Sequence, residues 1–179
     1  MSRIAIPAIQ SATGATADVY GQVRKIAGGQ VPNLFATLGH LAPAQLAAVL
    51  NAEGALGAGS LGHKDLETIK LLVSVQTGCD YCVAAHSMVG KLVGLSPDTL
   101  QAIRAGNPTG DAKRDALVRF VTLLVRSNGT IDAAEFEAIK AAGYGDAQLA
   151  EISLAIALTV FTNVFNRIND TTVDFPPVK

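Results

Sequence analysis

The chain has 179 residues and a mass of 18.5 kDa, which corresponds to one domain with room for a sizeable core. Hydrophobic residues make up 49% of the chain and charged residues only 16%, a composition that excludes an intrinsically disordered protein. Fourteen basic and fifteen acidic side chains leave a net charge of −1, which argues against a nucleic-acid-binding protein because such proteins need a clustered basic excess.

Apolar residues recur at spacings of three and four along almost the whole chain, and glycines or prolines separate the periodic segments. No segment alternates over enough residues to predict a strand. We therefore predict a single all-α domain over residues 1–179, with about eight or nine compactly packed helices. In chain order, the predicted helices span residues 16–27, 32–39, a segment that begins at Pro43, then 63–77, 80–93, 96–105, 111–127, 132–142 and 146–169.

Several helix ends are predicted from single residues. Gly78 is placed to end the helix before it in a left-handed conformation, and Asp80 is a plausible N-cap for the next helix. Ser96 and Pro97 suit the N-cap and first helical positions of a later helix. The glycines from position 54 onward are expected to end the Pro43 helix in a loose connection.

A weak internal repeat is visible between two of the predicted helices. Five apolar positions of the segment 66–75 recur 83 residues later in the segment 149–158. Two apolar helices can match in this way by chance, so an internal duplication is one of two readings. If it is real, the second copy has lost the cysteines, since Thr162 and Phe165 stand in their places.

No segment has the pattern of an export signal or of a membrane span. The apolar stretch near the N-terminus is short and is broken by Pro7, and the apolar run 152–165 is shorter than the roughly 18 residues that a span needs. We therefore expect a cytoplasmic protein. So few charges on so apolar a chain also predict that part of its outer surface is buried in a homo-oligomer.

The two cysteines stand in the most informative segment of the chain. Cys79 and Cys82 are three residues apart at a predicted helix start, where the helix dipole favours a thiolate and a disulfide can close across one turn. His86 follows one turn later on the same helix stripe, within reach of the Cys82 sulfur as a base. Glu67 lies on the preceding helix, and the tight turn at Gly78 should fold it against His86, directly or through a water.

A dithiol with its own base is suited to redox chemistry. A thiolate attacks the O–O bond of a hydroperoxide and becomes a sulfenic acid, and the neighbouring thiol condenses with it to a disulfide. An external dithiol must then reduce that disulfide. A thiol-dependent peroxidase in antioxidant defence is therefore the first hypothesis, with Glu67, Cys79, Cys82 and His86 as its catalytic residues and with no cofactor.

Other interpretations of the same residues remain open. The pair could serve a protein disulfide oxidoreductase or redox sensor, or the cysteines could simply pack inside a non-catalytic helical oligomer. Zinc is a rival ligand, although positions i, i+3 and i+7 of one helix do not easily surround a tetrahedral ion, and we predict no metal. A haem attachment signal is excluded because Val83 follows Cys82, and a thioredoxin context is excluded because no βαβ pattern surrounds the pair.

The remaining polar candidates carry weaker signals. His40 is expected at the edge of the core, and His63 at a helix start, where it could pair with Glu67. Tyr81, between the cysteines, is equally suited to a substrate entrance and to packing. The polar stretch 163–167 in the last helix is expected at a subunit interface rather than at the dithiol. A solvated helix face is predicted for Lys113, Arg114 and Arg119.

The segment resembles the carboxymuconolactone decarboxylase superfamily, and within it the alkyl hydroperoxidase D-like, or peroxidase-related, branch. The resemblance extends upstream through residues 31–35 and downstream to about residue 106, roughly half of the chain with specific features. The matching pattern is an acid, a first cysteine twelve positions later, the second cysteine of the CxxC pair, and a histidine four positions after that. In this chain these residues are Glu67, Cys79, Cys82 and His86.

The resemblance implies an all-α fold, often duplicated, that assembles as trimers or hexamers. It implies that Cys82 attacks the peroxide, that Cys79 resolves the sulfenic acid, and that His86 is the base with Glu67 behind it. It also implies a hydroperoxide substrate and a reducing partner of the lipoyl or thioredoxin type. The best-studied branch has a second histidine just before the later cysteine, where this chain has Tyr81, and the lactone-decarboxylase branch lacks the CxxC pair.

Overall fold

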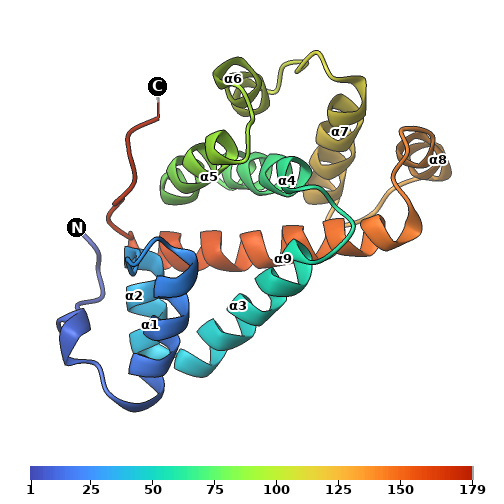
Figure 1. Cartoon of the computed structure of the whole chain (residues 1–179). Helices are drawn as coiled ribbons and strands as arrows, with labels where there is room; N and C mark the ends of the chain where they lie inside the picture. The colour runs from blue at the N-terminus through green and yellow to red at the C-terminus, as the bar shows by residue number, and fades with distance from the viewer. Residues whose placement is uncertain (179) are drawn as a thin grey trace.

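The computed structural model describes residues 1–178 and confirms the all-α prediction (Figure 1). Within that part of the chain there are nine α-helices, one short 3-10 helix and no strand. The predicted helices all exist, with ends displaced by one or two residues, and the 3-10 helix was not predicted. Their bounds are η1 Ile9–Ser11, α1 Gly14–Ile26, α2 Asn33–Leu41, α3 Pro43–Gly57, α4 His63–Gln76, α5 Asp80–Leu92, α6 Pro97–Ala105, α7 Ala112–Arg126, α8 Ala133–Ala141 and α9 Asp146–Asn169.

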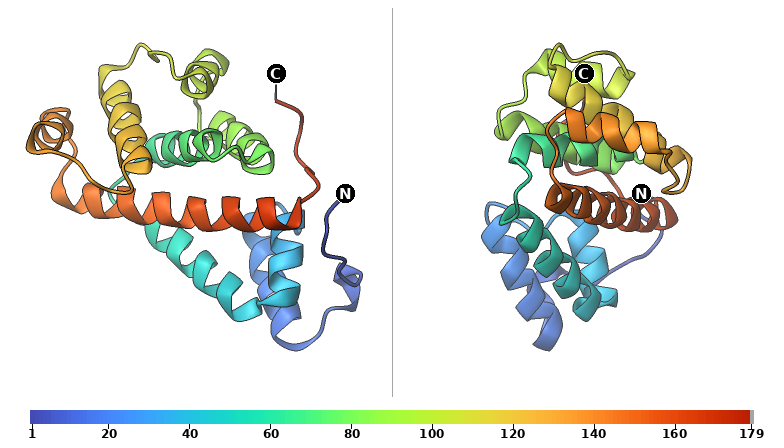
Figure 2. Two further views of the ribbon diagram at one scale, coloured as in Figure 1. Left: turned by 180° about the vertical axis from the view of Figure 1, so that it is seen from behind. Right: turned by 90° about the vertical axis from the view of Figure 1, so that its right-hand side faces the viewer.

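Helix α9 runs through the middle of the molecule. The helices α1, α2 and α3 lie on one side of it, and α4 to α7 lie on the other side (Figures 1 and 2). The larger hydrophobic core lies where α4, α7 and α9 meet, around fully buried side chains such as Ile69, Val121 and Ile152. A smaller core joins α1, α2 and α3 around Val23 and Leu46. Helix α4 is therefore enclosed on several sides, which explains why even its polar members are buried.

The turn between α4 and α5 positions the cysteines. Gly78 adopts the predicted left-handed conformation, with φ +67°. The backbone N–H of Gly78 donates to Val75 O at 3.1 Å, and that of Cys79 donates to Ser74 O at 3.0 Å, which is the Schellman pattern. The chain thus reverses within two residues, and α5 folds back against α4.

One predicted helix boundary was wrong and two were right. Cys79, not Asp80, is the N-cap of α5, because Asp80 already has helical geometry as the first residue of that helix. Gly54 lies inside α3, but the helix ends at Gly57 and the connection that follows contains Gly59 and Gly62, as predicted. Ser96 caps α6 as predicted, and its Oγ accepts a hydrogen bond from the Thr99 N–H at 3.1 Å.

The internal repeat does not extend to the helix pair. Helix α9 continues without interruption through Phe161, which corresponds to the Gly78 turn at the spacing of 83 residues. The similarity is therefore confined to α4 and the first half of α9, two apolar helices that pack against each other.

Helix α9 has an exposed apolar stripe, which we call the α9 seam. By length and composition, α9 is the one helix within residues 1–178 that could cross a membrane. It is longer than the apolar run 152–165 on which the sequence-based expectation of no membrane span was based. The core helix of a soluble protein passes the same test of length and composition. Only 22% of its most apolar window is buried. The seam repeats at spacings of three and four, and its exposed members are Ala147, Ala150, Leu154, Ala157, Phe161, Val164 and Ile168.

Candidate active site

Both cysteines are free thiols buried at the start of α5. The exposed fraction is 2% for Cys79 and 3% for Cys82. Cys79 occupies the N-cap, and Cys82 lies within the first turn, where unpaired backbone N–H groups concentrate positive potential. The predicted adjacency of the pair to a helix N-terminus is therefore present, but the sulfurs are shielded from bulk solvent.

The two sulfurs share a proton, and this separates their acidities. A hydrogen bond from the Cys82 thiol, with a smaller contribution from the Arg167 charge, lowers the pKa of Cys79 to about 7 against the opposing effect of burial. The same hydrogen bond, together with burial, raises the pKa of Cys82. In the resting dithiol the negative charge therefore resides on Cys79, and Cys82 keeps the proton.

The predicted contact between α4 and α5 is present. His86 Nδ1 lies 2.9 Å from Glu67 Oε2, across the tight turn. Burial alone would raise the pKa of Glu67, but the charges and hydrogen bonds of His86 and Lys70 outweigh it and the pKa of this carboxyl is lowered. An ionised Glu67 accepts the Nδ1 proton, which leaves Nε2 of His86 as the free base.

Behind Glu67 stands a buried lysine that the sequence reasoning missed. Lys70 Nζ lies 3.7 Å from Glu67 Oε1 and 2.6 Å from Glu53 Oε2 on α3. Its side chain is only 11% exposed. The signal in the sequence was a lysine one turn after Glu67 in a helix whose other faces are apolar. The acid–base pair is thus the end of a longer charged chain, Glu53, Lys70, Glu67 and His86.

No direct hydrogen bond joins His86 to a sulfur among residues 1–178. The hydrogen bond of His86 goes to Glu67, whereas Cys82 Sγ accepts one from Nδ2 of Asn166 at 3.2 Å. The geometry therefore brings Glu67 to His86 and Cys79 to Cys82, and places Asn166, not His86, on the Cys82 sulfur.

The polar stretch 163–167 faces the dithiol, which corrects the expectation of a subunit interface. Asn163 Nδ2 donates to Thr77 Oγ1 at 2.7 Å, and Arg167 donates to Thr77 O at 2.6 Å. With Asn166 on Cys82, these side chains tie α9 to the turn that carries the cysteines. They are polar within an apolar helix because the turn leaves polar atoms that need partners.

The C-terminal segment covers the site. The Tyr81 ring makes an edge-on contact with Phe175, with ring centroids 5.3 Å apart, and its hydroxyl accepts a hydrogen bond from the Leu34 N–H at 3.1 Å. Asn33 holds the same segment through Asp174 Oδ2 at 2.8 Å and through Thr172 O at 2.9 Å. We call residues 171–178 the C-terminal strap. Tyr81 therefore packs beneath the strap, and the pKa of its hydroxyl is raised by burial.

The surroundings of the sulfurs are apolar and aromatic. The cysteines cluster with Leu34 and Tyr81, and three partly buried rings pack against this cluster, namely Phe35, Phe165 and Phe175. The sequence did not reveal this grouping, because the rings come from three segments that meet only in the folded chain.

The other sequence candidates lie elsewhere. His40 and His63 are exposed on α2 and at the start of α4, and Glu67 pairs with His86 and Lys70 instead of His63. Arg114 does not belong to a solvated face, because its side chain is 13% exposed and pairs with Asp111 at 2.9 Å. Within residues 1–178, no three His, Cys, Asp or Glu side chains converge as a metal site.

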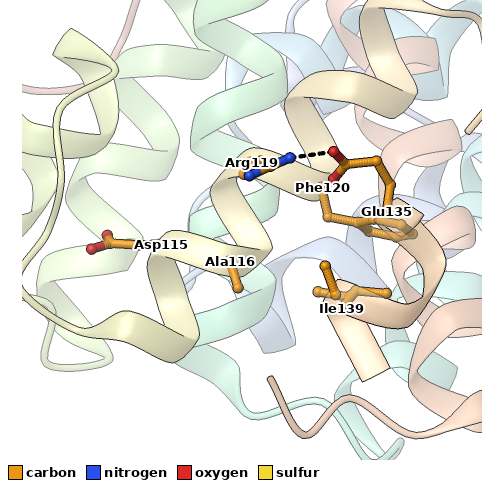
Figure 3. A pocket seen from close by; sticks show the side chains of 7 residues that line it. Asp115, Ala116, Arg119, Phe120, Glu135 and Ile139 are labelled. Carbon is orange, nitrogen blue, oxygen red and sulfur yellow. Dashed lines mark hydrogen bonds and ion pairs between the residues drawn. The ribbon is translucent and has the colours of Figure 1, made fainter. Parts of the chain in front are cut away.

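Two hollows in the surface lie away from the dithiol. One, of about 300 Å³, lies between α7 and α8, where Arg119 forms an ion pair with Glu135 (Figure 3). The other, of about 610 Å³, lies beside it against the end of α4 and includes Gln76 and Arg104. Neither is lined by a cysteine, by His86 or by Glu67.

Comparison with protein families identifies the segment around the dithiol. Residues 42–117 match the model of the carboxymuconolactone decarboxylase family, and this range contains α4, α5 and both cysteines. This part of the chain is therefore similar to the carboxymuconolactone decarboxylase family. No curated protein sequence matches the chain significantly.

Solved structures share the fold over nearly the whole chain. A peroxidase-related protein from Ralstonia eutropha JMP134 with an alkylhydroperoxidase AhpD core has 23% identity and a TM-score of 0.83, covering 97% of this chain and 92% of its own. A peroxidase-related protein from Silicibacter sp. TM1040 has 20% identity and a TM-score of 0.78, covering 96% and 91%. The debrominase Bmp8, solved with 2,3,4-tribromopyrrole, has 18% identity and a TM-score of 0.80, covering 97% and 94%. The fold is therefore AhpD-like.

Proposed function

We propose that the protein is a thiol-dependent hydroperoxide reductase that uses Cys79 and Cys82 as its redox pair. The observation that carries the proposal is the dithiol at a helix N-terminus with a pKa of about 7 at Cys79, next to a histidine held by an ionised carboxylate. A thiolate at neutral pH is the nucleophile that this chemistry requires. The peroxidase-related proteins of the same fold support the same class of reaction.

In the proposed reaction Cys82 passes its proton to Nε2 of His86 and attacks the terminal oxygen of the hydroperoxide. The O–O bond breaks, Cys82 becomes a sulfenic acid, and the released alkoxide takes that proton from His86. The Cys79 thiolate then condenses with the sulfenic acid, so that a disulfide forms and the expelled hydroxide takes up a solvent proton and leaves as water. A partner dithiol of the lipoyl or thioredoxin type returns the pair to the reduced state and is itself oxidised.

One contact and one position on the helix favour Cys82 as the attacking thiol. Asn166 donates a hydrogen bond to its sulfur, which stabilises a charge that arrives there, and His86 follows one helical turn later. Capture of the sulfenic acid with dimedone tests the assignment: the adduct should form on Cys82 in a Cys79→Ser protein. An adduct formed only on Cys79, in a Cys82→Ser protein, would reverse the two roles.

A thiol titration tests the function as a whole. Reduced, metal-free protein is mixed with one equivalent of cumene hydroperoxide, and free thiols are counted in denaturant before and after. We expect the loss of two thiols per chain and their return with dithiothreitol. Full turnover in Cys82→Ser protein, or no loss of thiols in the wild type, contradicts the proposal and leaves the packed, non-catalytic pair as the better description.

The burial of the sulfurs favours a small substrate over a protein substrate. Each cysteine is at most 3% exposed beneath the strap, whereas a disulfide oxidoreductase must present its attacking sulfur to a folded partner. Stable mixed disulfides with other proteins in a Cys79→Ser strain, without peroxide turnover, would support the oxidoreductase or redox-sensor alternative.

Reductive dehalogenation is a second candidate, supported by the aromatic rings around the dithiol. A debrominase has the same fold, and its structure holds a flat brominated pyrrole. The balanced reaction converts an aryl bromide and two thiols into the arene, hydrogen bromide and one disulfide. Bromide release from 2,3,4-tribromopyrrole, measured beside thiol loss with cumene hydroperoxide, distinguishes the two activities.

A further inference from the structure

The side-chain amide of Asn166 lies against the sulfur of Cys82, and only its nitrogen end has a hydrogen-bond partner. The residue is 2% exposed, and its Nδ2 donates to Cys82 Sγ at 3.2 Å. Its Oδ1 is buried and has no hydrogen-bond partner within residues 1–178. Asn163, one turn earlier and equally buried, is satisfied at both ends, by Thr77 and by Ser74. A buried acceptor without a partner costs stability, so its retention beside Cys82 indicates a partner that arrives with the substrate.

The proton shared by the cysteines fixes the orientation of the amide. The Cys82 thiol donates its only proton to Cys79, so the Cys82 sulfur can offer nothing but lone pairs to Asn166. The amide must therefore present Nδ2 to the sulfur, and Oδ1 is left as the unpaired end.

We propose that Asn166 is a further catalytic residue, whose Nδ2 holds the Cys82 sulfur and whose Oδ1 accepts the O–H of the hydroperoxide. The inference rests on the peroxidase function proposed above. A hydroperoxide has one O–H donor, and it belongs to the terminal oxygen, the atom that the thiolate attacks. Because the two ends of one amide are fixed relative to each other, binding that O–H at Oδ1 places the terminal oxygen beside the sulfur.

The proposed step is balanced without any further reactant. The sulfur forms a bond to the terminal oxygen as the O–O bond breaks, and the electron pair of that bond leaves with the alkoxide. The alkoxide takes from Nε2 of His86 the proton that Cys82 gave up when it became a thiolate. The proton of the original O–H stays on the new sulfenic oxygen, where Oδ1 of Asn166 still accepts its hydrogen bond.

Access to this amide coincides with access to the sulfurs. Oδ1 is buried, and the amide that carries it is hydrogen-bonded to Cys82, a member of the cluster against which Phe165 and Phe175 pack. A hydroperoxide therefore meets Asn166 and Cys82 together, when the strap lifts, and an apolar organic group on the hydroperoxide replaces the aromatic contacts that are lost.

Two electrophiles with different hydrogen-bonding capacity test the proposal. The second-order rate of thiol loss is measured for cumene hydroperoxide, which has an O–H, and for methyl methanethiosulfonate, which has no donor. The proteins are the wild type, Asn166→Leu, which has a similar volume and no amide, and Asn163→Leu as the matched control on the same helix. Asn166→Ala serves if the leucine variant does not fold, and circular dichroism verifies the fold in each case.

We expect Asn166→Leu to slow the hydroperoxide reaction by about tenfold to a hundredfold more than the methanethiosulfonate reaction. Asn163→Leu, which loosens the turn but does not touch the sulfur, should change both rates by the same factor. An equal loss of both rates in the Asn166 variants overturns the proposal, because it reduces Asn166 to a structural role. A wild-type protein that reacts with the methanethiosulfonate but not with cumene hydroperoxide instead overturns the peroxidase function itself.

Discussion

The acidity of the cysteine pair depends on a few identified neighbours. The thiol hydrogen bond from Cys82 and the Arg167 charge lower the pKa of Cys79 to about 7, whereas an ordinary cysteine titrates near about 8.5. The thiolate therefore appears as the pH rises through 7. We expect the absorbance at 240 nm of the reduced protein to increase with a midpoint near pH 7.

Two variants locate the origin of that midpoint. Cys82→Ala removes the thiol donor without putting a hydroxyl in its place, and Arg167→Gln removes the positive charge, so each should move the midpoint upward. A midpoint that stays unchanged in both variants contradicts this explanation. Double replacement of Cys79 and Cys82 by serine supplies the baseline without thiolate.

Lys70 stabilises the ionised form of Glu67. In Lys70→Met protein the buried carboxylate keeps only His86, so we expect a loss of about 1–3 kcal/mol in the free energy of unfolding at pH 7. Because the pKa of Glu67 is lowered in the folded protein, its contribution is present above the unfolded pKa and is lost as the pH falls through the folded value. Urea unfolding should thus show the two proteins converging below about pH 4.

The control for this effect is Lys91→Met, which removes the same charge from an exposed position of α5. It should change the free energy of unfolding by less than about 0.5 kcal/mol. If Lys70→Met is equally mild, the charged chain behind His86 contributes little to stability.

At the scale of single elements, the α4–α5 turn depends on the left-handed conformation of Gly78. A Cβ at this position would meet nothing within 4 Å, so the cost of Gly78→Ala is conformational. We expect a loss of about 1–2 kcal/mol, measured by urea unfolding. Gly54 also has open space around it but lies inside α3, and Gly54→Ala should stabilise the protein by about 0.5–1 kcal/mol. If Gly78→Ala and Gly54→Ala change the free energy of unfolding in the same direction, the backbone conformation of the glycine does not decide the effect.

The strap is a second element with a measurable effect, since it covers the thiols through the Tyr81–Phe175 contact. An aromatic pair of this kind contributes about 1 kcal/mol, so Phe175→Ala should raise the rate of thiol alkylation by N-ethylmaleimide several-fold. Val178→Ala, a truncation at an exposed position of the same strap, is the control. Equal rates in both variants would show that strap opening does not limit access.

The helices and the acid–histidine contact could be predicted from the sequence because both are local. Helix periods and capping residues lie within each segment. The tight turn at Gly78 folds α5 against α4, and this brings the side chains of Glu67 and His86 together. The role of Asn166 was not predictable in the same way, since its partner Cys82 lies 84 positions away and a polar residue in an apolar helix does not say which neighbour it faces. The strap was overlooked for the same reason: its proline-bearing sequence indicates no helix, and its contacts are all tertiary.

At the scale of the whole molecule, the α9 seam is consistent with the homo-oligomer expected from the composition. Seven apolar residues at spacings of three and four form a stripe of the kind that pairs helices, and no charge interrupts it. An antiparallel copy centred on Ala157 brings Leu154 opposite Phe161 and the acidic start of the helix near Arg167. We predict that Phe161→Glu converts an assembled protein into monomers in analytical ultracentrifugation. Gln101→Glu, which adds the same charge on the exposed face of α6, should leave the assembly unchanged, and a monomeric wild type would contradict the prediction.

The position of α9 at the end of the chain has a consequence during synthesis. Cys82 leaves the ribosome 84 residues before Asn166, which at about 5–20 residues per second is a delay of roughly 4 to 17 s. Throughout that interval α4 and α5 lack the helix that buries them, and the strap that shields the sulfurs does not yet exist. A nascent chain therefore exposes a thiol pair that the finished protein hides, and oxidants reach the cysteines most easily before the protein that would use them is complete.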